Sequence, residues 1–133
     1  MPTDRESQLL KGVLPMLVLG LLAAEESYGY ELVTRLQALG LADMSAGTVY
    51  PVLNRLERDG AVASRLVASS SGPARKYYRP TPAGLADLAA SRDAWAHLAA
   101  TVAAALHLPA DTPTDTPTDT PIDTPIDTVP KEQ

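Results

Sequence analysis

Apolar side chains recur at helical spacing along most of the chain. The stretches with this pattern, which predict four helices, are residues 13–24, 30–39, 45–60 and 82–107. Gly40 and Gly60 follow two of these stretches, where a residue in the left-handed conformation ends a helix. Pro15 is expected in the first turn of the first helix, and the residues before about Ser7 are expected to be mobile.

Between the third and fourth predicted helices the pattern changes to partial alternation. Residues 61–68 alternate as a strand does, residues 69–74 have the composition of a turn, and residues 75–79 fit a returning strand. A hairpin that follows two short helices is typical of a winged helix-turn-helix. We therefore predict an α+β fold, mainly α, with a long C-terminal dimerisation helix.

The composition limits the class of protein. The 133 residues suffice for one small domain, and without cysteine neither a disulfide framework nor a thiolate metal site is available. The apolar run 13–24 is shorter than the roughly 20 residues that cross a bilayer. Helix-forming, charged sequence follows it at once, which disfavours a signal peptide. We expect a cytoplasmic protein with no membrane partner.

The predicted folded part lacks the patterns of an enzyme. It shows no nucleophile–base pair, no glycine-rich phosphate loop and no clustered carboxylates, so no catalytic residues and no cofactor are predicted. His97 and His107 stand ten residues apart on one predicted helix, with no carboxylate pair facing them. No metal site is predicted from them.

Charge is sorted by position along the chain. The formal net charge is −5. Residues 109–133 carry six acids against one lysine, net −5, whereas residues 55–80 carry six bases against two acids, net +4. The basic part coincides with the third predicted helix and the hairpin, which favours an anionic partner there.

The exposed side of the third predicted helix is small, polar and basic, a surface that a DNA major groove accepts. The residues of this side and of the hairpin that offer hydrogen bonds or charge to DNA are Ser45, Tyr50, Asn54, Arg55, Arg58, Arg75 and Lys76. Ser45 is also expected to cap the helix through its hydroxyl. Pro51 removes an amide donor in the second turn and predicts a late start or a bend. Taken alone, the stretch is more typical of a solvated surface helix, so the neighbouring elements have to decide between the two.

Motifs across residues 9–106 resemble the PadR family of bacterial transcriptional regulators. They include Tyr28-Gly-Tyr-Glu31, Gly47-Thr-Val-Tyr-Pro51, Leu56-Glu-Arg-Asp-Gly60 and Gly72-Pro-Ala-Arg-Lys-Tyr-Tyr78. The resemblance implies a homodimer that binds an inverted-repeat operator in double-stranded DNA, usually as a repressor released by a small-molecule effector. It adds Lys11, Tyr28 and Thr48 to the DNA-binding positions.

The last predicted helix carries a heptad seam. Thr81 is expected to cap it, with Pro82 at its first position. The seam consists of Leu85, Leu88, Arg92, Trp95, Ala99, Val102 and Leu106, with Arg92 as a charged interruption. A helix of about 25 residues is longer than a small domain covers, which predicts dimerisation through the apolar members of the seam. Trp95 is either an interface anchor or a contact for a flat aromatic effector.

We divide the chain into residues 1–81 (DNA-binding domain), 82–108 (dimerisation helix) and 109–133 (tail). The tail repeats Asp-Thr-Pro and is expected to be disordered and extended, because proline every fourth residue opposes helix and sheet. It is either a repeat expansion without a role or a competitor of DNA for the basic face. For the whole chain, a winged-helix module for protein–protein interaction is the alternative function.

Overall fold

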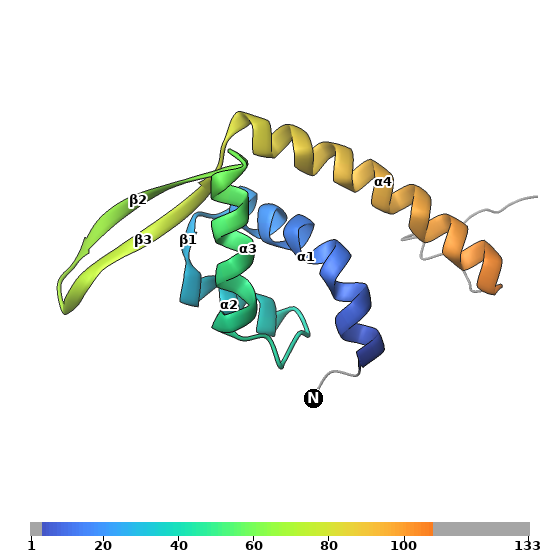
Figure 1. The fold of residues 1–133 in the computed structure, drawn as a ribbon, viewed down its shortest axis with the longest axis horizontal. Helices are drawn as coiled ribbons and strands as arrows, with labels where there is room; N and C mark the ends of the chain where they lie inside the picture. Colours follow the sequence, from blue (N-terminus) through green and yellow to red (C-terminus); the bar gives the residue numbers. More distant parts are fainter. Residues whose placement is uncertain (1–3, 108–133) are drawn as a thin grey trace, which may run out of the picture. The chain divides into compact units, whose positions relative to one another are not determined.

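The computed structural model describes residues 4–107, which form helices and a small antiparallel sheet (Figure 1). In chain order the elements are α1 (Asp4–Ala24), β1 (Ser27–Tyr28), α2 (Gly29–Ala38), α3 (Ala46–Arg58), β2 (Val62–Ser69), β3 (Gly72–Pro80) and α4 (Pro82–Leu106). The predicted α+β class and the winged helix-turn-helix order are confirmed. The chain divides into two compact units, residues 1–95 and 96–133. The tail 109–133 lies outside the described residues.

The hydrophobic core lies between α1, α2 and α3. Its most deeply buried apolar side chains are Val18, Leu32, Leu36, Val49 and Leu53. In the predicted stripe of α3, Leu56 is also buried and Val52 packs partly buried against the core. Each fully buried side chain of this size contributes about 1.5–3 kcal/mol, so the stripe anchors α3. Leu39, the last residue of the predicted helix 30–39, is 60% exposed and lies just beyond α2, which ends at Ala38.

Helix α1 is longer than predicted. It begins at Asp4, so residues 4–6 of the segment expected to be mobile are helical, and the prediction that Pro15 lies in the first turn is wrong. Residues 4–11 are mostly charged or long-chain residues with good helix propensity, which extends the helix toward the N-terminus. Leu14 and Val18 are buried on either side of the proline, and their packing holds the helix across it.

The helix extends beyond the apolar run 13–24, so by length and composition alone Arg5–Ala24 of α1 is long and apolar enough to cross a membrane. The core helix of a soluble protein passes the same test. Four apolar side chains of α1, namely Leu14, Val18, Leu19 and Leu22, belong to the hydrophobic core. Packing inside the domain therefore accounts for the apolar character of this helix.

The strands form a three-stranded antiparallel sheet in the order β1-β3-β2. The pairing of β2 with β3 runs from Val62 opposite Pro80 to Ser69 opposite Gly72, so only residues 70–71 remain for a turn that is shorter than predicted. Figure 1 shows this hairpin extending away from α1, α2 and α3. The hairpin is confirmed, whereas β1 was not predicted, because its two residues give no periodic signal.

The end of α3 and the start of α4 meet at one crossing. Thr81 caps α4 as predicted, since its Oγ1 accepts a hydrogen bond from the amide of Gly84 at 3.0 Å. The same hydroxyl donates to the carbonyl of Gly60 at 2.6 Å, and Gly60 has the left-handed φ of 81° expected after α3. A Cβ on Gly84 would overlap the carbonyl oxygen of Ala61. Glycine at position 84 is therefore required for this close approach.

Candidate nucleic-acid interface

Helix α3 starts earlier than its proline suggested. It begins at Ala46 and spans 13 residues with Pro51 inside, so the predicted late start is wrong. The amide that Pro51 lacks would have bonded to the carbonyl of Gly47, and Gly47 is exposed, so water can serve that carbonyl. The predicted cap by the Ser45 side chain is also wrong. Its hydroxyl lies 3.3 Å from that of Thr48 instead of binding a backbone amide.

The side of α3 opposite the core is open to solvent. Its exposed residues are Ser45, Gly47, Thr48, Tyr50, Pro51, Asn54, Arg55 and Arg58. Within residues 4–107, the side chains of Asn54 and Arg55 make no hydrogen bond or ion pair. Arg58 lies 3.9 Å from Asp59, but both side chains are mostly exposed and such a pair contributes little. These polar groups are therefore free for a partner outside the domain.

Tyr50 also helps to position α3. It is 39% exposed, and its ring packs so closely on Gly29 that a Cβ there would overlap the ring and lie 2.5 Å from the hydroxyl. Gly29 is the first residue of α2. The ring therefore holds the outer side of α3 against the beginning of α2.

The face of the hairpin toward α3 carries Lys76. Its Nζ donates to Oε1 of Glu57 on α3 at 3.0 Å, and the hydroxyl of Ser64 donates to Oε2 of the same carboxylate at 2.5 Å. These two hydrogen bonds lower the pKa of the Glu57 carboxyl, and the bond to Glu57 raises the pKa of Lys76. The structure thus places Lys76 against an acid rather than at an open edge of the hairpin.

The other face of the hairpin stacks arginines on tyrosines. The guanidinium of Arg75 lies 4.5 Å from the ring centre of Tyr28, which itself meets Tyr77 edge-on at 5.3 Å. Arg65 donates to both carboxylate oxygens of Glu26 at 2.8 and 2.6 Å. These hydrogen bonds are the main reason that the pKa of the Glu26 carboxyl is lowered. Within residues 4–107, Arg75 pairs with no carboxylate, so its charge is available to a phosphate.

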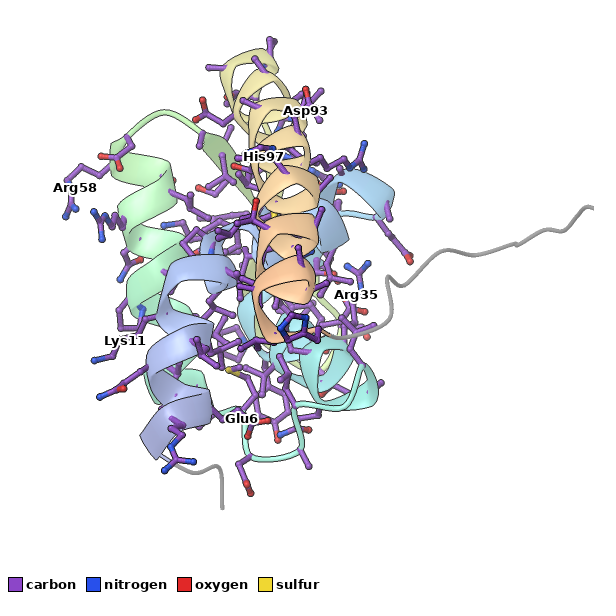
Figure 2. All side chains as sticks on the ribbon, turned by 90° about the vertical axis from the view of Figure 1, so that its right-hand side faces the viewer. Glu6, Lys11, Arg35, Arg58, Asp93 and His97 are labelled. Carbon is purple, nitrogen blue, oxygen red and sulfur yellow. The ribbon has the colours of Figure 1, made fainter. Side chains whose placement is uncertain are left out.

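Lys11 precedes the predicted first helix, 13–24, but lies about two turns inside α1. Figure 2 shows Lys11 and Arg58 pointing to the same side of the molecule and Arg35 to the opposite side. Lys11 and Thr48 also line one cleft between the N-terminal half of α1 and the connection from α2 to α3. The structure thus brings Lys11 to the side on which α3 is exposed.

Arg35 is an organising residue that the sequence did not reveal. Its guanidinium donates to the carbonyls of Leu21 at 2.7 Å and Glu25 at 2.9 Å, and to the hydroxyl of Ser27 at 2.6 Å. Ser27 is buried, and the carbonyls lie at the end of α1. Arg35 therefore fastens α2 to the end of α1 and to β1. An arginine in a last helical turn gives no sequence signal of such partners.

The predicted seam of α4 is exposed except at Leu88 and Ala99. Leu88 is 5% exposed and packs in the core of residues 1–95, so its assignment to a dimer seam is wrong. Among large apolar side chains of α4, Leu85, Trp95, Leu98, Val102 and Leu106 are exposed. Leu98 was not part of the predicted seam. Ala99 is partly buried.

The part of the chain that the structure describes holds no group of three or more histidine, aspartate or glutamate side chains arranged to bind a metal ion. His97 and His107 are both exposed.

The fold and the exposed side of α3 define a winged helix-turn-helix protein. The chain matches the model of the transcriptional regulator PadR-like family over residues 18–90, more than half of its length. It therefore belongs to the PadR-like family of transcriptional regulators, a family without enzymatic activity. It is 49% identical over 61 residues to transcriptional regulator Rv3488 of Mycobacterium tuberculosis, a match that covers 44% of this chain but only 54% of that protein.

Solved structures agree with this assignment. A PadR-like transcriptional regulator from Bacillus cereus is 41% identical, with a TM-score of 0.68 over 74% of this chain and 96% of the other. A PadR family regulator from Eggerthella lenta is 40% identical, with the same TM-score over 74% and 86%. Bacillus subtilis PadR, solved in complex with operator DNA, is 28% identical, with a TM-score of 0.53 over 57% and 43%.

Proposed function

We propose that the chain is a cytoplasmic, DNA-binding transcriptional regulator that reads duplex DNA with α3. The observation that carries this is the division of α3 into a buried apolar stripe and an open polar side, on which the side chains of Asn54 and Arg55 make no hydrogen bond or ion pair with residues 4–107. An anchored helix that presents free amide and guanidinium groups suits base edges in the major groove. The relative from Bacillus subtilis, solved with operator DNA, supports the same assignment.

The remaining DNA-binding positions divide by role. Lys11 and Arg58 point to one side of the molecule and suit the phosphate backbone. Arg75, stacked on Tyr28, suits the sugar–phosphate edge or the minor groove beside the hairpin. Ser45 and Thr48, at the first turn of α3, allow close approach of the helix start to a phosphate.

We further propose that two copies assemble through α4. Its exposed apolar side chains, with Trp95 among them, form a surface that a lone chain leaves in water. A two-fold dimer of a helix-turn-helix reads an inverted repeat, because its two α3 helices are related by the same symmetry. Action as a repressor, and release by a flat aromatic effector at Trp95, are proposed from the resemblance to the family alone. As the chain has one tryptophan, its fluorescence reports such an effector directly.

Selection of binding sites from a random DNA library, followed by affinity measurement, tests the proposal. Asn54→Ala and Arg55→Ala should each lower the affinity for the selected site about 5- to 100-fold. Gln8→Ala, which removes an exposed amide on α1, should leave that affinity unchanged. Affinity should fall steeply with added salt. Failure to select any site, with no salt dependence, would favour a protein–protein interaction module instead. Light scattering, which compares the molar mass of Val102→Asp with that of the parent chain, tests whether two copies assemble through α4.

A further inference from the structure

One carboxylate joins the recognition helix to both strands of the hairpin. Glu57 lies in the last turns of α3, and its two oxygens accept from Ser64 on β2 at 2.5 Å and from Lys76 on β3 at 3.0 Å. Within residues 4–107, no other side-chain hydrogen bond or ion pair links α3 to the hairpin. The Glu57 side chain is 33% exposed, so water competes only partly with these contacts.

A second carboxylate binds the hairpin without reaching α3. Glu26 holds Arg65 of β2 and precedes β1, which already pairs with β3 in the same sheet. Its side chain is 28% exposed, close to the 33% of Glu57. Loss of this ion pair removes a contact at a sheet whose strands are already joined by backbone pairing. Loss of the Glu57 contacts removes a constraint between two separate elements.

We propose that Glu57 is a positioning residue that fixes the hairpin relative to α3, so that both meet DNA in a single register. The proposal rests on the proposed DNA-binding function. When the hairpin and α3 are held together before binding, no conformational entropy has to be lost to order them on DNA, and the affinity is correspondingly higher. Glu57 also keeps Lys76 beside an acid, which leaves Arg75 as the cation near the hairpin turn that pairs with no carboxylate of residues 4–107.

The matched variants Glu57→Gln and Glu26→Gln separate positioning from charge. Each removes one negative charge and one ion pair from the hairpin, so general attraction to DNA rises equally in both. The chain has no cysteine, so Ala42→Cys and Ser71→Cys, both at exposed positions, accept spin labels cleanly. Labelled chains are diluted with unlabelled chains, so that the two labels of one chain are measured together. The distribution of the distance between the labels at positions 42 and 71 is then measured without DNA. We expect a broadened distribution for Glu57→Gln and an unchanged one for Glu26→Gln.

Binding and footprinting on the selected operator complete the test. Glu57→Gln should bind about fivefold more weakly than Glu26→Gln and lose protection beside the hairpin while keeping that at α3. Equal affinities of the two variants, or a distribution in Glu57→Gln as narrow as in the parent, would overturn the proposal. If the parent chain binds no DNA, the proposed function fails, while the distance measurement still decides whether Glu57 positions the hairpin. Thermal melts of both variants confirm that they fold.

Discussion

Replacement of Gly84 by alanine should reverse the usual effect of that substitution. In a helix, glycine to alanine normally stabilises by about 0.5–1 kcal/mol, since alanine loses less backbone entropy on folding. At Gly84 the added methyl would overlap the carbonyl oxygen of Ala61 and lie 2.8 Å from its carbon and 3.2 Å from its Cα. These are backbone atoms, so no side chain can turn aside to make room.

The cost follows from what must move. Separating α4 from Ala61 strains the hydrogen bond from the Thr81 amide to the Ala61 carbonyl, 3.0 Å long, and lifts Leu88 from the core. Overpacking of this kind costs about 1–3 kcal/mol, which outweighs the propensity gain. For a domain of this size each kcal/mol shifts Tm by about 4–8 °C, so we expect Gly84→Ala to melt roughly 5–15 °C below the parent.

Gly12→Ala is the matched control, because it also lies in a helix and its Cβ would have no atom within 4 Å. It should raise Tm by a few degrees, about 0.5–1 kcal/mol. Both variants are melted by circular dichroism at one protein concentration, since the proposed dimerisation would make Tm depend on concentration. If Gly84→Ala is as stable as Gly12→Ala, the crossing of α4 over Ala61 is not as close as described, and the reasoning fails.

Three further predictions concern single side chains. The pKa of the Glu57 carboxyl is lowered from 4.5, so its contribution to stability is present above pH 4.5 and is lost as the pH falls through the pKa of the folded state. Urea titrations at a series of pH values should therefore show that the free energy of unfolding falls less steeply toward acid pH in Glu57→Gln than in the parent. Arg35→Met leaves two carbonyls and a buried hydroxyl without their donor, and should cost about 1–3 kcal/mol in urea unfolding. Gly29→Ala should displace Tyr50 and weaken operator binding, an effect that should vanish in a Tyr50→Ala background.

The helices and the hairpin could be predicted because each one shows its own pattern within a short window. The stripe Val49, Leu53 and Leu56 marks the buried side of α3 and, by elimination, its open side. Gly60 ends α3 by a local conformational requirement that no partner alters. Side chains that depend only on which way a helix faces, such as Asn54, were therefore placed correctly as exposed.

Contacts between distant segments gave no such signal. The bond from Lys76 to Glu57 spans 19 residues and that from Arg65 to Glu26 spans 39. Charged residues in a helix or strand are usually solvated, so nothing in their spacing indicates these partners. Leu88 was misassigned for a related reason, since a heptad pattern does not tell which apolar positions the domain itself will cover.

The same contacts decide which substitutions can report on DNA binding. Tyr50 packs on α2, and Lys76 is held by Glu57, so removing either side chain alters the placement of α3 or the hairpin as well as any contact with DNA. Asn54 and Arg55 have no such second role within residues 4–107. A loss of affinity at these two positions measures the contact itself, whereas the same loss at Tyr50 or Lys76 combines the contact with the cost of repositioning an element. On α3 the proposed reading residues Asn54 and Arg55 were recognised from the sequence pattern, whereas the positioning contacts of Tyr50 and Glu57 were not.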